Sequence, residues 1–69
     1  MLGKYITQWR KERGMTCTEL ARQSGHPVSS IHGIERGANK NPHFRIIIDI
    51  SNVLQVSLDD MQKAFDGKE

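Results

Sequence analysis

Residues 15–37, MTCTELARQSGHPVSSIHGIERG, carry the signals of two short helices separated by a tight turn. Thr16 stands where a helix cap is expected, and Glu19 follows three residues later, which is the capping-box spacing. Gly25 is predicted to end the first helix, because glycine adopts the left-handed backbone that a sharp turn needs. Pro27 is expected in the first turn of the next helix, where its missing N–H does no harm. The stretch therefore predicts a helix-turn-helix arrangement.

The second of these helices, predicted from Val28 to Arg36, has two different faces. Ile31 and Ile34 are three residues apart and point the same way, so we expect them, together with Glu35, to face the body of the protein. The opposite face is almost bare of bulk and carries Val28, Ser29, His32, Gly33 and Arg36. A glycine inside a helix costs about 1 kcal/mol relative to alanine. A helix backbone that must lie close to another surface would explain why this cost is tolerated. The alternative is that Gly33 is merely a weak point in the helix.

The length of 69 residues indicates one domain, which we place at residues 1–66, with a frayed tail at 67–69. A domain of this size buries only about 60% of the surface that its unfolded chain exposes. The lone Cys17 excludes an internal disulfide and is typical of a reducing compartment. The first residues lack the apolar core of a signal peptide, and the longest aliphatic run, residues 46–48, is far below the about 20 residues of a membrane span.

The net charge of +2 is unevenly distributed along the chain. Residues 1–45 carry eight Lys or Arg against three acids, a balance of +5, whereas residues 46–69 carry two against five, a balance of −3. A basic first part and an acidic end are consistent with one side that faces a polyanion and another that faces solvent or a partner. Two ordinary solvated surfaces are the alternative.

Three further helices are predicted from apolar residues that recur with helical spacing, over residues 2–13, 43–55 and 57–66. Their expected inward positions are Leu2, Ile6 and Trp9; Phe44, Ile47, Ile50 and Leu54; and Leu58, Met61 and Phe65. In the helix predicted over residues 43–55, Ile46 and Val53 make the apolar face wider than a small core needs. In the helix predicted over residues 2–13, Arg13 is expected in solvent. With no strand signal and short connections, the chain is predicted to be an all-α domain of five helices.

The chain resembles the phage repressor and Cro-like helix-turn-helix family, also called the XRE family. The resemblance rests on residues at family spacings along nearly the whole chain: Ile6, Trp9-Arg10, Gly14, Thr16, Glu19-Leu20-Ala21, Gly25, Ser29, Ile31, Ile34-Glu35-Arg36-Gly37, Asn41-Pro42, Ile50, Leu54 and Val56-Ser57-Leu58. Within this family the chain is most similar to the DNA-binding half of SinR-type repressors, and it aligns with them without gaps from Met1 through Ser57.

This resemblance implies a five-helix, lambda-repressor-like bundle in which helices 2 and 3 form the helix-turn-helix. The third helix of such domains enters the major groove of DNA, usually as a homodimer on an inverted repeat. The implied function is sequence-specific binding of double-stranded DNA by a transcriptional regulator, most often a repressor, without enzymatic activity or a cofactor. The implied setting is the cytoplasm of a bacterium, at the nucleoid, with the gene carried by the bacterium or a phage.

Family positions assign possible roles to residues of this chain. The candidates for reading bases are Val28, Ser29, His32 and Gly33, and the candidates for the DNA backbone are Thr16, Cys17, Thr18, Ser30, Arg36, Asn39, Lys40, Asn41 and Arg45. Position 17 often bears glutamine in the family, so Cys17 weakens or replaces a usual contact. The resemblance also implies a structural ion pair between Arg10 and Glu35, joining the first and third helices.

The third helix departs from the family in the chemistry that it offers to DNA. Family members commonly carry glutamine, arginine or lysine there, which reach base edges with two hydrogen bonds. Here Val28 can contact a thymine methyl, Ser29 several bases, and His32 a guanine or a phosphate. We therefore expect part of the specificity to come from DNA shape, bridging water or loop residues.

Other functions are weakly indicated. The acids, histidines and cysteine show no nucleophile–base pattern. The spacings of His26, His32, His43 and Cys17 match no zinc pattern, so no metal site is expected. The stronger rival is a protein-interaction module of the antitoxin or antirepressor type, supported by the sparse third helix and the extra apolar residues Ile46, Val53 and Phe65. A restriction–modification controller and a regulatory protein partner also remain open, because one fold serves several roles.

Overall fold

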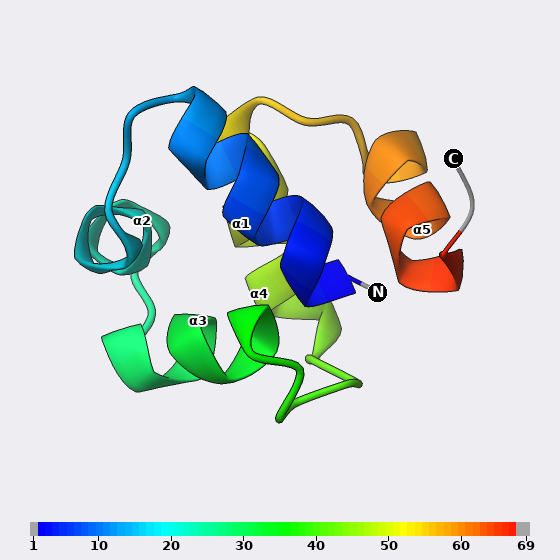
Figure 1. The fold of residues 1–69 in the computed structure, drawn as a ribbon, viewed down its shortest axis with the longest axis horizontal. Coiled ribbons are helices and arrows are strands. Elements are labelled where there is room, and N and C mark those ends of the chain that lie inside the picture. The colour runs from blue at the N-terminus through cyan, green and yellow to red at the C-terminus, as the bar shows by residue number, and fades with distance from the viewer. Residues whose placement is uncertain (1, 68–69) are drawn as a thin grey trace.

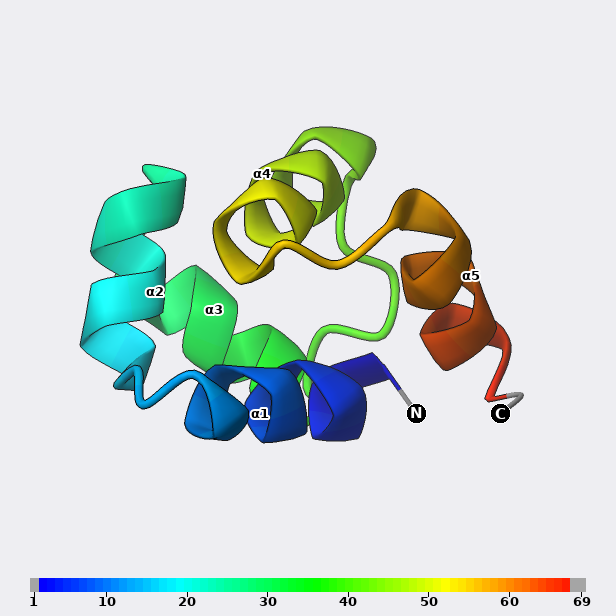
Figure 2. The ribbon, with the colours of Figure 1, turned by 90° about the horizontal axis from the view of Figure 1, so that it is seen from above.

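Helices account for most of residues 2–67, the part of the chain that the computed structural model describes. They are α1 (Leu2–Glu12), α2 (Cys17–Ser24), α3 (Val28–Glu35), α4 (Phe44–Leu54) and α5 (Leu58–Asp66), and this part contains no strand (Figure 1). α2 packs on α3 and α4, α1 packs on α3 and α5, and α4 packs on α5 (Figure 2). The all-α, five-helix prediction is confirmed. Gly67 caps α5, and the rest of the expected tail, residues 68–69, lies outside the described residues.

The turn between α2 and α3 is built as its sequence predicts, with one difference. Thr16 Oγ1 accepts a hydrogen bond from Glu19 N at 3.1 Å, which completes one half of the capping box of α2. Gly25 ends α2 with φ of 77°, in the left-handed region. Pro27 does not lie in the first turn of α3 but precedes it as the N-cap, with extended backbone. Since its side chain accepts no hydrogen bond, α3 begins without a side-chain cap.

The core forms where the inward faces of the helices meet. Its fully buried large side chains are Ile6, Leu20, Ile31, Ile34, Ile50, Leu54 and Met61. Trp9 is half-buried against this core and packs beside Tyr5, with ring centroids 5.9 Å apart. No helix among the described residues has the length and apolar character needed to cross a membrane.

The predicted inward stripe of α4 is wrong at its first position. Phe44 is 71% exposed, whereas Ile46, which the sequence marked as surplus, is 3% exposed and belongs to the core. The buried face of α4 is centred on Ile50 and Leu54, and at about 100° of rotation per residue Phe44 falls to its side. Phe44, the first residue of α4, therefore points away from the core.

The apolar positions predicted for α5 need the same correction. Leu58 is 51% exposed and Phe65 is 42% exposed, whereas Met61 and Ala64 are buried. α5 is short and packs at the edge of the bundle, so only two of its residues are buried in the core. Met61 and Ala64 occupy those places, so Leu58 and Phe65 remain on the outer side.

Arg13 is a further difference from the prediction, because it is not simply a solvated charge. Its Nε donates to Leu54 O at 2.6 Å, and its Nη1 donates to Trp9 O at 2.9 Å. The guanidinium therefore joins the end of α1 to the end of α4. Within residues 2–67, no buried side-chain nitrogen or oxygen lacks a hydrogen-bond partner.

Candidate nucleic-acid interface

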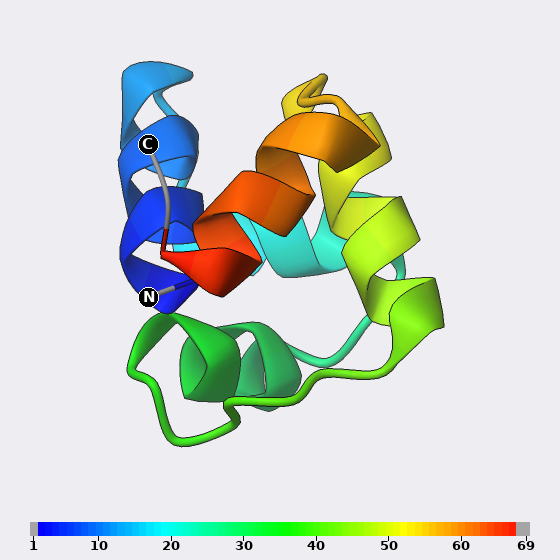
Figure 3. The same cartoon turned by 90° about the vertical axis from the view of Figure 1, so that its right-hand side faces the viewer.

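The outward face of α3 is open to solvent along its length. Val28, Ser29, His32 and Arg36 are exposed, and Gly33 is half-exposed. The opposite face is anchored, since Ile31 and Ile34 are at most 1% exposed. The predicted division of α3 into two faces is therefore confirmed. α3 and the loop that follows it form the lower edge of the molecule in Figures 1 and 3.

Gly33 leaves free space on this outward face. A Cβ atom added at Gly33 would meet no protein atom within 4 Å outside the helix's own backbone. Packing inside the chain therefore does not require a glycine here, although alanine would suit the helix better. Both readings of Gly33 therefore stay open, namely close approach of another molecule to the α3 backbone and a weak point in the helix.

The candidates for backbone contacts lie on α3 and its end and on three other segments. At the start of α2, Thr16 and Thr18 are exposed and Cys17 is half-buried; in the loop after α3, Asn39, Lys40 and Asn41 are exposed; Arg36, Arg45 and half-buried Ser30 complete the set. The exposed termini of helices and basic side chains are suited to phosphate oxygens. Arg45 is partly engaged already, because its Nε lies 3.3 Å from Asp49 Oδ2.

Cys17 is a neutral group at this surface. Burial raises the pKa of its thiol, the nearby negative charge of Glu35 raises it further, and Arg10 acts in the opposite direction. The thiol therefore stays protonated at neutral pH and adds no negative charge where a phosphate would lie. A weak S–H donor replaces the amide that the family often has at this position.

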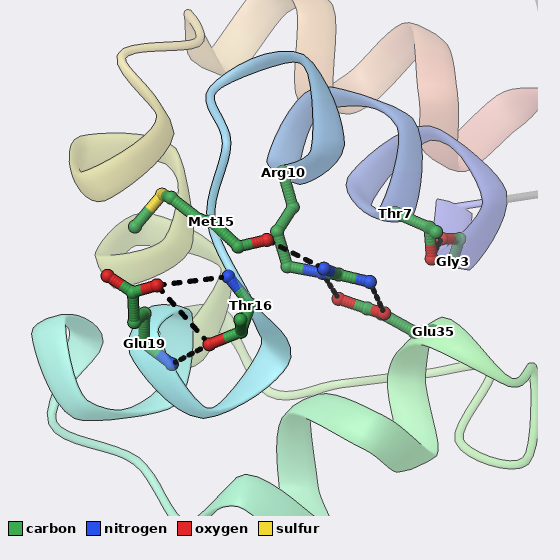
Figure 4. A network of polar contacts seen from close by, with 7 residues as sticks. All are labelled: Gly3, Thr7, Arg10, Met15, Thr16, Glu19 and Glu35. Atoms are coloured by element: carbon green, nitrogen blue, oxygen red, sulfur yellow. Dashed lines mark hydrogen bonds and ion pairs between the residues drawn. The ribbon is translucent and has the colours of Figure 1, made fainter.

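A buried ion pair holds α3 against α1. Arg10 Nε and Nη2 donate to the two carboxylate oxygens of Glu35 at 2.8 and 3.0 Å, and Arg10 Nη1 donates to Met15 O at 2.8 Å (Figure 4). The hydrogen bond to Glu35 raises the pKa of Arg10. The two side chains are 12% and 7% exposed. The predicted pair is confirmed, and it also fixes the loop that leads into α2.

Gly3 sets the distance between the start of α1 and the end of α3. An added Cβ would lie 2.6 Å from Glu35 O and would also clash with Ile34 O. Both obstacles are backbone atoms, which cannot rotate away as a side chain can. Figure 4 shows Gly3 beside Thr7, whose Oγ1 donates to Gly3 O at 2.8 Å. The position of α3 thus depends on a missing side chain as well as on the ion pair.

A polar contact that the sequence did not reveal joins the turn before α3 to α4. His26 Nε2 lies 2.8 Å from Asp49 Oδ2. This hydrogen bond, together with the charge of Arg45, lowers the pKa of Asp49 despite partial burial. Nearby, His43 caps α4 by accepting a hydrogen bond from Ile46 N through Nδ1 at 3.2 Å. His26 and Asp49 are 23 residues apart, so no local spacing could indicate their contact.

Most of the residues that the sequence offered as metal ligands have other contacts in the described part of the chain. Among residues 2–67, no group of three or more His, Cys, Asp or Glu is placed to hold a metal ion. Three of the histidine and cysteine residues considered for zinc instead have roles in this structure: His26 pairs with Asp49, His43 caps α4, and Cys17 is partly buried beside Glu35. The exposed face of α3 thus belongs to a helix whose other face is packed in the core.

The fold and the exposed α3 define a helix-turn-helix domain, and comparison with known proteins agrees. A family model described as "Helix-turn-helix" matches residues 6–61, so the chain belongs to this family. The chain is 36% identical over 69 residues to the HTH-type transcriptional regulator SinR of Bacillus licheniformis. That match covers 100% of this chain and 62% of the relative, so the chain spans under two thirds of its length.

Solved structures of SinR have the same fold. A crystal structure of SinR, the master regulator for biofilm formation, in complex with DNA has a TM-score of 0.86 at 37% identity, over 90% of this chain and 98% of that one. The structure of a SinR and SinI protein complex has a TM-score of 0.85 at 38% identity, over 88% of this chain and 59% of that one. The predicted similarity to SinR-type repressors is confirmed.

Proposed function

We propose that this chain binds double-stranded DNA in a sequence-specific manner, with α3 in the major groove. The observation that carries the proposal is the open, small-residue face of α3 on a helix whose other face is buried and clamped to α1. A helix presented in this way can approach base edges while its angle stays fixed. The likeness to SinR solved in complex with DNA, at 37% identity, supports the same use of the fold.

The regulatory role is part of the proposal. We infer a transcriptional regulator, most often a repressor in this family, that acts as two copies on an inverted repeat and performs no catalysis. Its relatives with assigned roles are transcriptional regulators from Bacillus, so we place it in the bacterial cytoplasm, where the DNA is. Because the chain spans only part of their length, the activity of the whole protein is inferred from its DNA-binding portion.

The division between base readers and backbone contacts gives the first prediction. Ser29→Ala and His32→Ala should weaken binding to the operator more than binding to random DNA, because base contacts carry the sequence information. Lys40→Ala should weaken both by a similar factor and flatten the log–log salt dependence by about one unit, because it removes one phosphate contact. Fluorescence anisotropy with both duplexes at several salt concentrations measures the two effects.

The same titrations can contradict the proposal. An equal loss on both duplexes would remove Ser29 and His32 from the base readers. An unchanged slope would remove Lys40 from the phosphate contacts. A parent protein that binds no duplex at low salt, where electrostatic attraction is strongest, would exclude DNA binding altogether.

A second function is favoured by one observation. A SinR structure with the SinI protein shows that a relative with this fold also takes a protein partner. A module of the antitoxin or antirepressor type would likewise bind a protein, whereas a restriction–modification controller would bind DNA and belongs with the first function. Binding to a protein would depend only weakly on salt, whereas DNA affinity should fall steeply as salt rises. The salt series therefore separates these two functions.

The substitution Gly33→Ala should affect stability and operator binding in opposite directions. Gly33→Ala should raise the free energy of unfolding by up to about 1 kcal/mol, because alanine is the better helix former and the space is empty. The same methyl group should weaken operator binding if the α3 backbone lies against DNA. Thermal unfolding and anisotropy on one preparation check both signs. A more stable variant with unchanged affinity would show that DNA does not approach Gly33.

A further inference from the structure

The start of α3 is less firmly anchored than its end. The end is held by the buried ion pair to α1, whereas the buried residues of α3, Ile31 and Ile34, leave its first turn outside the core. Pro27, the N-cap residue, contributes no side-chain hydrogen bond. Val28 and Ser29, two of the candidate base readers, lie in this first turn. Their position therefore depends on what holds the turn that precedes α3.

A small displacement of this start would be enough to change contacts with bases. α3 has 8 residues and is therefore about 12 Å long. A pivot of about 10° around the clamped end would move the first turn by about 2 Å. Hydrogen bonds to base edges form over about 2.7–3.2 Å, so a shift of that size would break them. Selective binding thus requires a second anchor at the start of the helix.

The contact between His26 and Asp49 is placed to be this anchor. His26 precedes α3 by two residues, and its Nε2 lies 2.8 Å from Asp49 Oδ2 on α4, with the two side chains 16% and 19% exposed. The hydrogen bond lowers the pKa of Asp49, so the carboxylate is ionised at neutral pH. An ionised carboxylate only accepts hydrogen bonds, so His26 Nε2–H donates. The backbone N–H of His26 also donates to Ala21 O at 3.1 Å, which ties the same residue to α2.

The neighbouring imidazole supports this geometry. The rings of His26 and His43 are 5.9 Å apart between centroids. His43 Nδ1 accepts a hydrogen bond from Ile46 N, so its lone pair is in use and the ring is neutral while it caps α4. A neutral ring beside His26 limits its rotation without competing, as a second cation would, for the carboxylate of Asp49.

The same carboxylate oxygen also restrains a candidate phosphate contact. Arg45 Nε lies 3.3 Å from Asp49 Oδ2, one turn away along α4, and the Arg45 side chain is 76% exposed. Phosphate contacts set the register of a protein on the duplex, whereas base contacts carry the sequence information. Asp49 therefore joins the turn before the candidate base readers to a side chain suited to the DNA backbone.

We propose that Asp49 is a positioning residue for DNA recognition, which fixes the start of α3 through His26 and orients Arg45, so that the chain prefers its own site to other sequences. The inference rests on the proposed binding of DNA through α3. Asp49 itself does not touch the DNA. Its effect is on selectivity, because its negative charge disfavours contact with any phosphate while its hydrogen bond favours the one arrangement of α3 that reads bases.

Substitution of Asp49 tests this role by comparing two DNA probes. One is the duplex that the parent protein selects from a random-sequence library, and the other is the unselected library. For Asp49→Ala, the ratio of the two affinities should fall roughly threefold to tenfold, the range of one hydrogen bond to a charged group. Affinity for the unselected library should not fall, because a negative charge beside Arg45 is removed. Fluorescence anisotropy measures both, and circular dichroism checks folding.

Asp59→Ala is the matched control. It makes the same chemical change and the same change of net charge at an exposed residue of α5. Its ratio of affinities should equal that of the parent. A lower ratio in both variants would mean that net charge, and not the position of Asp49, determines selectivity.

Variants of His26 test whether Asp49 acts through it. His26→Ala should lower the ratio by a similar factor, and the double variant with Asp49→Ala should lose little more than either single variant, since both remove one contact. His26→Gln keeps an N–H donor at a similar reach and should restore most of the ratio. Additive losses, or no recovery with glutamine, would overturn the inference.

Hydrogen exchange without DNA separates this inference from the proposed function. The amides of Ser30 and Ile31 both donate to Pro27 O, and they should exchange faster in Asp49→Ala than in the parent. Unchanged exchange there, or an unchanged ratio of affinities, would refute the positioning role and leave DNA binding intact. A parent that binds neither probe would refute the proposed function, whatever the exchange at the start of α3.

Discussion

Glu35→Ala should lower the free energy of unfolding by about 3–5 kcal/mol, because it leaves a buried guanidinium without its carboxylate. Arg10 would keep only the hydrogen bond from Nη1 to Met15 O, while its side chain is 12% exposed. A small domain has a total stability of about 5–10 kcal/mol, so the loss removes a large part of it. Urea unfolding followed by circular dichroism measures the change.

Two control variants separate the buried pair from an ordinary surface charge. Glu12 lies 3.6 Å from Arg13 with its side chain 55% exposed, so Glu12→Ala should cost less than about 1 kcal/mol. The double variant Arg10→Met with Glu35→Leu removes both charges together, and it should be more stable than Glu35→Ala alone. If Glu35→Ala proved no more harmful than Glu12→Ala, the pair would have no structural importance.

The same variant has a consequence for function. Glu35 ends α3, and its partner Arg10 also holds the loop before α2 through Met15 O. Losing the carboxylate therefore removes the bridge between α3 and α1 and leaves Arg10 with only its bond to Met15 O. We expect specific DNA binding to fall even at temperatures where the variant remains folded, because base contacts need a fixed approach angle.

Local patterns were sufficient to predict most of the helix-turn-helix. The capping box of Thr16 and Glu19 and the left-handed Gly25 depend on neighbours within four residues, so the sequence displays them directly. The Arg10–Glu35 pair joins residues 25 apart and was predicted only through family resemblance. The interactions that depend on three-dimensional placement were missed. Arg13 reaches Leu54 O across 41 residues, and no periodicity indicates such a contact.

Periodicity also failed where a helix lies at the edge of the bundle. It correctly marked Phe44, Leu58 and Phe65 as apolar, but it could not show that the core had no room for them. The sequence therefore correctly predicted apolar side chains in excess of the core. In α4 it named the wrong residue, because Ile46 is buried and Phe44 is exposed. For the candidate interface, the sequence predicted which residues of α3 are exposed, and their roles on DNA remain predictions.

Gly3→Ala should destabilise the protein by about 1–3 kcal/mol, which is the usual cost of overpacking. Two backbone carbonyl oxygens, those of Ile34 and Glu35, occupy the space that the new methyl group needs. In an unobstructed helix the same substitution would be stabilising by up to about 1 kcal/mol. The sign of the effect therefore reports whether α1 touches the end of α3.

Gly33→Ala is the matched control, because the chemical change is identical and the added methyl group meets open space. Thermal unfolding of the two variants side by side should give shifts of opposite sign, downward for Gly3→Ala and upward for Gly33→Ala. Two upward shifts would mean that α1 can move away from α3 at little cost. Opposite shifts would instead show that backbone contact with α1 holds α3 in place. The methyl group at position 3 could then fit only if α1 and the end of α3 moved apart.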